Sequence, residues 1–164
     1  MYAVRFHGRG GQGAKTASRI LGTAAFLSGY QAQDSPIYGA ERRGAPVSAF
    51  TRFGREPIRE RGGMAHPDLV VVADASLLGD PAARLSDGIT EQTILFVNSP
   101  LHAEQIRAQS ALPGRITTLG VTEIALQHFG QREAISALLG AGAARLAGLQ
   151  QEPLRQAIAR ELGD

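Results

Sequence analysis

The fold of this chain is decided by one stretch, His7-Gly8-Arg9-Gly10-Gly11-Gln12-Gly13, which separates two runs of different period. Before it, Tyr2, Val4 and Phe6 alternate with other residues, as in a strand; after it, apolar residues recur at helical spacing over 14–27. The glycines let the backbone approach another group closely, and a helix beginning near Gly13 would point its free N–H groups at that group. The stretch therefore predicts a strand, a loop and a helix, with the loop suited to an anion or another chain's carboxylate.

The spacing of the loop is close to that of two nucleotide-binding motifs. The spacing Gly8-x-Gly10-x-x-Gly13 is that of a dinucleotide fingerprint, and Asp34 lies near the place of its acidic residue. Residues 30–33 lack the apolar run of a second parallel strand, however. The spacing is also close to a P-loop, but Lys15 comes one residue late and would be rotated by about 100° on the helix. A third interpretation is that the glycines only let the helix pack closely on the sheet.

The stretch also carries a resemblance to a known family. Further matching segments are Lys15-Thr16-Ala17-Ser18-Arg19-Ile20-Leu21, Tyr38-Gly39-Ala40-Glu41-Arg42-Arg43-Gly44-Ala45-Pro46-Val47, Pro67-Asp68-Leu69-Val70-Val71-Val72 and Thr122-Glu123-Ile124-Ala125. Together they resemble the gamma subunit of the 2-oxoacid:ferredoxin oxidoreductases, of which the pyruvate and 2-ketoisovalerate enzymes are the best known. The resemblance covers nearly the whole chain in the family's order, and the segment 38–44 is more specific than any lone glycine loop.

The resemblance implies a Rossmann-like α/β domain that packs on partner subunits. In the family, alpha and beta subunits hold thiamine diphosphate and magnesium, and the iron–sulfur clusters belong to beta or to a ferredoxin-like delta chain. The complex converts a 2-oxoacid and coenzyme A to an acyl-CoA and CO2, and ferredoxin accepts the electrons unless an added subunit passes them to NAD. This chain would complete the assembly and shape the coenzyme A side of the site. The expected partner-facing or coenzyme A-facing residues are Gly8, Arg9, Gly10, Gly11, Gln12, Gly13, Tyr38, Gly39, Glu41, Arg42, Arg43 and Gly44.

Composition narrows the function classes independently. The 164 residues suit a single domain, 1–164, and the formal charge of +2, with arginines scattered among acids, is not a nucleic-acid pattern. The absence of cysteine excludes thiolate-held clusters, disulfides and cysteine nucleophiles in this chain, and it is typical of a cytoplasmic protein. No targeting segment or membrane-span run is apparent, and no metal-ligand spacing or catalytic set is recognisable. We therefore expect an inactive, cofactor-free isolated chain that self-associates through surfaces meant for its partners; the alternative is a free-standing NAD, FAD or ATP module using Gly8–Gly13.

The remaining pattern predicts an α/β fold: a Rossmann-like open sheet, mostly parallel with an antiparallel β-ribbon, and helices on both faces. The run 69–73 predicts a buried central strand that ends at Asp74, which serves either as a ligand-facing group or as a helix cap. Residues 31–46 are expected to form a polar connection, and Thr122 to cap a helix over 123–129. Gly140 and Gly142 predict close approach of another backbone. Other expected strands span 47–53, 58–61, 94–97 and 116–119, and other expected helices span 101–108, the region from 135 to 149, and 153–162.

Overall fold

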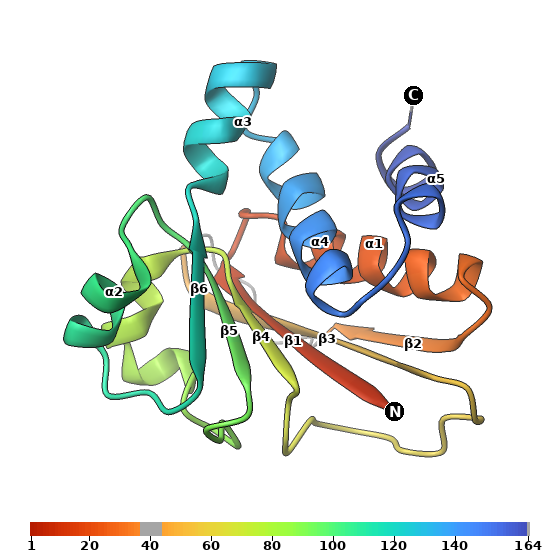
Figure 1. The fold of residues 1–164 in the computed structure, drawn as a ribbon, viewed down its shortest axis with the longest axis horizontal. Coiled ribbons are helices and arrows are strands. Elements are labelled where there is room, and N and C mark those ends of the chain that lie inside the picture. The colour runs from red at the N-terminus through yellow and green to blue at the C-terminus, as the bar shows by residue number, and fades with distance from the viewer. Residues whose placement is uncertain (37–43, 164) are drawn as a thin grey trace.

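A six-stranded sheet forms the centre of the computed structural model, which describes residues 1–36 and 44–163 (Figure 1). The strand order is β2-β3-β1-β4-β5-β6. The strands β1, β4, β5 and β6 run parallel, whereas β3 pairs antiparallel with both β1 and β2. The strand bounds are β1 (Tyr2–Arg9), β2 (Gln31–Pro36), β3 (Pro46–Gly54), β4 (Leu69–Val72), β5 (Ile94–Asn98) and β6 (Arg115–Leu119).

Helices cover both faces of this sheet. The helices α1, α4 and α5 lie over one face, and α2 with two short 3₁₀ helices lies over the other (Figure 1). Their bounds are α1 (Ala14–Leu27), η1 (Ala75–Gly79), η2 (Pro81–Ala83), α2 (Ala103–Gln109), α3 (Val121–Phe129), α4 (Ala134–Leu146) and α5 (Gln151–Leu162). The predicted fold class, a mostly parallel open sheet with an antiparallel part, is confirmed.

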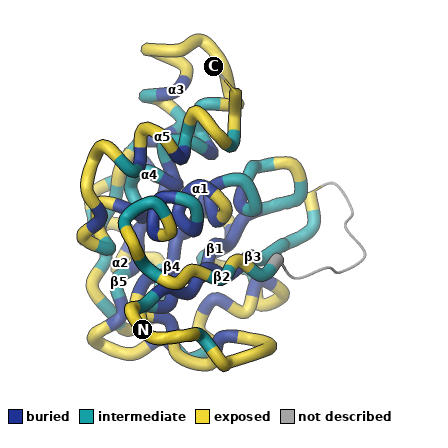
Figure 2. Tube along the Cα trace, turned by 90° about the vertical axis from the view of Figure 1, so that its right-hand side faces the viewer, coloured by how far each residue is buried: buried dark blue, intermediate teal, exposed yellow. Residues whose placement is uncertain are grey.

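The strand β4 shows why its sequence places it in the middle. All four residues are apolar and buried: Leu69 and Val71 join the core under α1, and Val70 and Val72 join the core under α2. Each such side chain stabilises the fold by about 1.5–3 kcal/mol through burial. Only a strand with neighbours and helices on both sides can bury every residue in this way (Figure 2).

Small residues bring α4 close to its neighbours. A Cβ added at Gly140 would lie 3.0 Å from the carbonyl oxygen of Ala17 on α1, and one at Gly142 would lie 2.4 Å from the Phe96 ring on β5. Side chains at these two positions would push α4 away from the core. The predicted close approach of another backbone is therefore confirmed at Gly140, whereas Gly142 faces a side chain.

Three predicted elements were wrong. Residues 31–36 form the strand β2 and not part of a connection; its polar residues suit an edge strand that pairs with β3 on one side. Residues 58–61 form no strand, because β3 already has β1 and β2 as neighbours and leaves no edge for a returning ribbon. The helix α3 begins at Val121 with Gly120 at its N-cap, so Thr122 does not cap it.

Candidate functional site

The glycine loop joins the carboxyl end of β1 to the start of α1. The N–H of Gly10 donates to the carbonyl of Ala45 at 2.9 Å, and the N–H of Gln12 donates to the carbonyl of Arg9 at 3.0 Å. Gly11 and Gly13 have φ values of 89° and 78°, in the left-handed region that favours glycine. The loop thus turns tightly, and α1 starts directly after Gly13, with no side-chain cap.

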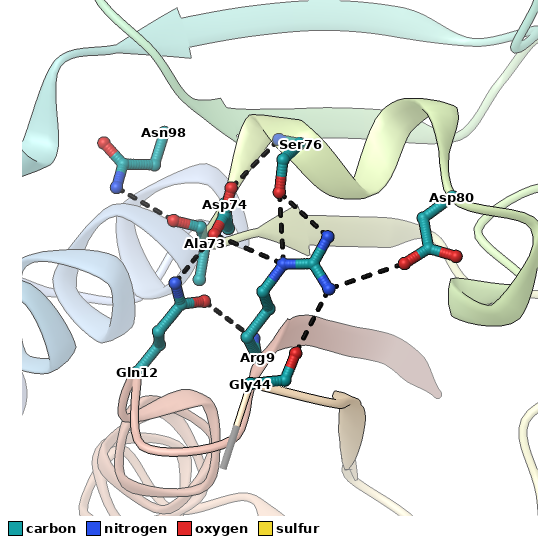
Figure 3. A network of polar contacts seen from close by, with 8 residues as sticks. All are labelled: Arg9, Gln12, Gly44, Ala73, Asp74, Ser76, Asp80 and Asn98. Atoms are coloured by element: carbon teal, nitrogen blue, oxygen red, sulfur yellow. Dashed lines mark hydrogen bonds and ion pairs between the residues drawn. The ribbon is translucent and has the colours of Figure 1, made fainter.

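The side chain of Gln12 connects this loop to the end of β4 (Figure 3). Its Oε1 accepts from the backbone N–H of Arg9 at 2.7 Å, and its Nε2 donates to Oδ2 of Asp74 at 2.7 Å. Because both ends of the amide have partners, the side chain is held in one orientation. Gln12 therefore positions the loop over the carboxyl end of β4.

Arg9 forms a second connection from the loop, and most of its N–H donors bond to groups of the same chain (Figure 3). Its Nε and one terminal nitrogen lie 3.1 and 3.0 Å from Oγ of Ser76, and the other terminal nitrogen lies 3.2 Å from the carbonyl of Gly44 and 3.4 Å from Asp80. Asp74 lies 3.7 Å from Nε. Arg9 therefore connects the loop to Gly44 and to the residues that follow β4.

Of the two roles predicted for Asp74, the helix cap is confirmed, and the ligand-facing role stays a prediction. Its Oδ1 accepts from the backbone N–H of Ser76 at 2.9 Å and caps η1, while its Oδ2 faces the loop through Gln12. Burial alone would raise the pKa of Asp74, but the hydrogen bonds from Gln12 and Ser76 outweigh burial, and the pKa lies below its ordinary value. The carboxylate is therefore charged at neutral pH and already has partners within the chain.

Asn98, at the end of β5, also lies at the carboxyl ends of the parallel strands, and its role was not predicted from the sequence. Its Nδ2 donates to the carbonyl of Ala73 at 3.0 Å and to Oγ1 of Thr122 at 2.9 Å, and its Oδ1 accepts from the N–H of Thr122 at 3.2 Å. An asparagine that ends a buried apolar strand was the available signal. It joins the ends of β4, β5 and the start of α3.

A pocket of about 390 Å³ opens beside the loop. Its wall combines the loop and the first turn of α1 with the end of β5 and the start of α4; the polar residues that line it are Gln12, Thr16, Asn98, Thr122, Arg132, Glu133 and Ser136. Ser136 lies against Gly13, where an added Cβ would come within 2.7 Å of the serine Cβ. The contributions of α4 were not predicted, because they come from more than a hundred residues further along the chain.

The two predicted binding segments meet only in part within the described residues. Gly8, Arg9, Gly10, Gly11, Gln12 and Gly13 form the loop, and Gly44 contacts it through Arg9. Tyr38, Gly39, Glu41, Arg42 and Arg43 lie outside the described residues. The end of the second segment therefore lies at the loop, and the binding role of both segments stays a prediction.

Asp34 does not lie where a dinucleotide fingerprint needs its acidic residue. It is on the antiparallel edge strand β2, and its carboxylate accepts a hydrogen bond from Ser18 on α1. Burial, the largest effect, raises the pKa of Asp34 above its ordinary value, although the bond from Ser18 and the charge of Arg19 lower it. Asp34 thus connects α1 to the sheet and does not lie at the glycine loop.

Within residues 1–36 and 44–163, no group of three or more acidic or histidine side chains could hold a metal ion. In the same ranges, no helix has the length and apolar character needed to cross a bilayer.

The chain is similar to known proteins over nearly its whole length. The family model for pyruvate ferredoxin/flavodoxin oxidoreductase matches residues 3–164. The common gamma subunit of the pyruvate/ketoisovalerate oxidoreductases of Pyrococcus furiosus is 41% identical over 170 residues, which cover 100% of this chain and 90% of the relative. The pyruvate synthase subunit PorC of Thermotoga maritima is 44% identical over 140 residues, covering 85% of this chain and 71% of the relative.

Solved structures give the same result for the fold. The pyruvate oxidoreductase subunit PORC from Thermotoga maritima superposes with a TM-score of 0.81 at 34% identity, covering 97% of this chain and 84% of that one. The 2-oxoglutarate:ferredoxin oxidoreductase from Magnetococcus marinus has the same fold, with a TM-score of 0.77 at 14% identity, over 99% of this chain and 27% of that one. Because the family model spans nearly all residues and a relative at 41% identity spans all of them, this chain belongs to the pyruvate ferredoxin/flavodoxin oxidoreductase family.

Proposed function

We propose that this chain is the gamma subunit of a multi-subunit 2-oxoacid:ferredoxin oxidoreductase. The observation that carries the proposal is the end-to-end match to a common gamma subunit. The complex would oxidatively decarboxylate a 2-oxoacid with coenzyme A, giving an acyl-CoA and CO2 and passing electrons to ferredoxin. Thiamine diphosphate, magnesium and iron–sulfur clusters would be held by alpha, beta and delta partners, in the cytoplasm.

The chemistry of the described residues supports a non-catalytic role within that complex. The polar side chains at the loop edge bond chiefly to one another: Gln12 bonds to Asp74, and Arg9 bonds to Ser76 and Asp80. A nucleophile or general base needs a free reactive atom next to substrate, and these groups are instead used to hold the loop. We infer that the chain supplies a shaped surface to its partners.

That surface would be the loop Gly8–Gly13 with the segment 38–44. Support comes from the exposed Gly11 in the loop, from the adjoining pocket and from the contact of Arg9 with the carbonyl of Gly44. The pocket has Arg132 and the positive start of α1 on its wall, with Glu133 beside them. A negatively charged part of coenzyme A or a partner carboxylate would suit the positive side of this wall.

Native purification from the source cells tests the proposal. A tagged chain should copurify with larger chains that carry thiamine diphosphate and iron, and mass spectrometry should identify them as the other subunits. The purified complex should release CO2 from a 2-oxoacid in the presence of coenzyme A and ferredoxin. A chain that purifies alone and binds NAD, FAD or ATP tightly in calorimetry would instead favour the free-standing nucleotide module.

A further inference from the structure

Three polar residues alternate along β1 on the face opposite α1: Arg5, His7 and Arg9. They do not have equivalent surroundings. Arg9, at the strand end, has Ser76, Gly44 and Asp80 as acceptors. Arg5 and His7 lie deeper, and their polar atoms are incompletely paired.

Arg5 is a buried cation that pairs with no carboxylate among the described residues. Its residue is 4% exposed, one terminal nitrogen donates to the carbonyl of Leu85 at 2.9 Å, and its Nε is buried without an acceptor in the described structure. Asp87 acts on it at longer range, but the carboxylate of Asp87 lies 2.6 Å from Arg84. Burial is the main cause that lowers the pKa of Arg5, and a buried guanidinium that lacks a counter-ion destabilises a folded chain.

His7 lies next to Arg5 and also has a buried polar atom that is unpaired among the described residues. The residue is 4% exposed, and its Nε2 is buried with no hydrogen-bond partner in the part of the chain that the structure describes. Burial, and then the charge of Arg5, lower the pKa of His7 to about 3, although a hydrogen bond to the backbone of Ala83 acts in the opposite direction. The imidazole is neutral at physiological pH, so only one ring nitrogen carries a hydrogen; that hydrogen is used in the bond to the backbone of Ala83, and Nε2 is a hydrogen-bond acceptor.

Both side chains line a pocket of about 470 Å³ between β3 and the segment that follows β4. Ser48, on β3 and directly paired with His7, adds a hydroxyl to the same wall. Val47, Phe50 and Met64 make the pocket apolar on another side. The pocket is thus amphipathic, with one buried positive charge.

We propose that this pocket binds the carboxylate of an organic monoanion, with Arg5 as its charge partner and the Ser48 hydroxyl as a hydrogen-bond donor. The charge supports a monoanion: Arg84 and Asp87, which also line the pocket, pair with each other, so Arg5 contributes the one uncompensated charge among the described lining residues. A phosphate dianion would leave excess negative charge next to Asp87. The apolar wall accommodates the carbon skeleton, and a guanidinium matches the two carboxylate oxygens.

The carboxylate has two sources that share this chemistry: a free small acid, or an acidic side chain of a partner subunit. Propionate is a suitable probe, with propionamide as a neutral molecule of the same shape and inorganic phosphate as an unrelated anion. The full-length isolated chain is titrated while the NMR signals of the Arg5 Nε–H group and the His7 ring are followed. We expect saturable shifts with propionate and none with propionamide.

Two variants give the test its controls. Arg5→Met keeps the volume and removes the charge, so propionate affinity should fall about tenfold or more, as for loss of a charge-assisted hydrogen bond. Its thermal midpoint should be unchanged or higher, because the variant removes an unpaired buried charge. Arg52, 2% exposed on the same sheet face, donates to the carbonyls of Gly62 and Gly63 at 3.0 and 2.7 Å, so Arg52→Met should lower the midpoint and leave propionate binding intact.

Repeating the titration in the assembled complex separates the sources. Binding in both forms indicates a small-molecule site, and binding to the isolated chain alone indicates that a partner's carboxylate fills the pocket. The proposal is overturned if propionate causes no saturable shift in the isolated chain, if propionamide or phosphate binds equally well, or if Arg5→Met binds as the parent chain does. The isolated-chain result does not depend on the gamma-subunit assignment.

Discussion

A Cβ built on Gly13 would lie 2.7 Å from the Cβ of Ser136, so the glycine loop and the start of α4 leave no room for a side chain between them. Gly13 also has φ 78°, which strains any residue with a Cβ. We predict that Gly13→Ala lowers the free energy of unfolding by about 2–4 kcal/mol, through left-handed strain and overpacking together. Urea unfolding measures the change.

Gly11 provides the matched control for this prediction. It has φ 89°, and an added Cβ would meet nothing within 4 Å, so Gly11→Ala should show the strain effect alone, about 1–2 kcal/mol. Adding Ser136→Gly to Gly13→Ala should recover the packing part. Equal effects of the two alanines, or no recovery, would contradict the contact as the cause.

Gln12 should make the stability of the chain depend on pH through Asp74. The folded-state pKa of Asp74 lies below its ordinary 3.8, so its contribution is present above that value and is lost as the pH falls through the folded-state pKa. Gln12→Leu removes one of the lowering hydrogen bonds and should cost about 1.5–3 kcal/mol at neutral pH. The difference from the parent chain should shrink in urea unfolding as the pH falls below 3.8.

Asp74→Asn is the control, because it removes the titrating group. In that background the effect of Gln12→Leu should be the same at neutral and acid pH. If the pH dependence persists there, another carboxyl group is responsible.

The core of the fold was predictable because its signals are local. The apolar run of β4 and the change of period at the glycine loop each specify an element within a few residues. The strand β2 was missed because it is polar; its pairing with β3 and the bond between Asp34 and Ser18 are tertiary interactions. Asn98 and Ser136 reach the site from distant elements, so only the fold could bring them to the loop.

The isolated chain should be colourless and free of iron, since it has no cysteine to ligate a cluster. It should also release no CO2 from 2-oxoacids when its partners are absent. Elemental analysis and a decarboxylation assay measure both properties. Stoichiometric iron or unaided turnover would contradict the assignment of cofactors and catalysis to partner subunits.

Arg42 and Arg43, which lie outside the described residues, should serve assembly or coenzyme A binding. Arg42→Ala with Arg43→Ala should change the free energy of unfolding by less than about 0.5 kcal/mol, as exposed arginines usually do. In the reconstituted complex the double variant should assemble more weakly or show a higher KM for coenzyme A. Unfolding of the variant would indicate a structural role, and normal assembly and turnover would place the function elsewhere.

The helix α3 should make the isolated chain self-associate. It projects from the rest of the chain (Figure 1), and Leu126 and Phe129 on it are 46% and 58% exposed. Exposed apolar groups close together on one surface favour association, so light scattering at micromolar concentration should give a mass above that of a monomer. Leu126→Ser with Phe129→Ser should shift the mass towards the monomer, whereas Gln127→Ser with His128→Ser, at exposed polar positions of the same helix, should not. A strictly monomeric parent chain would show that this surface does not drive association.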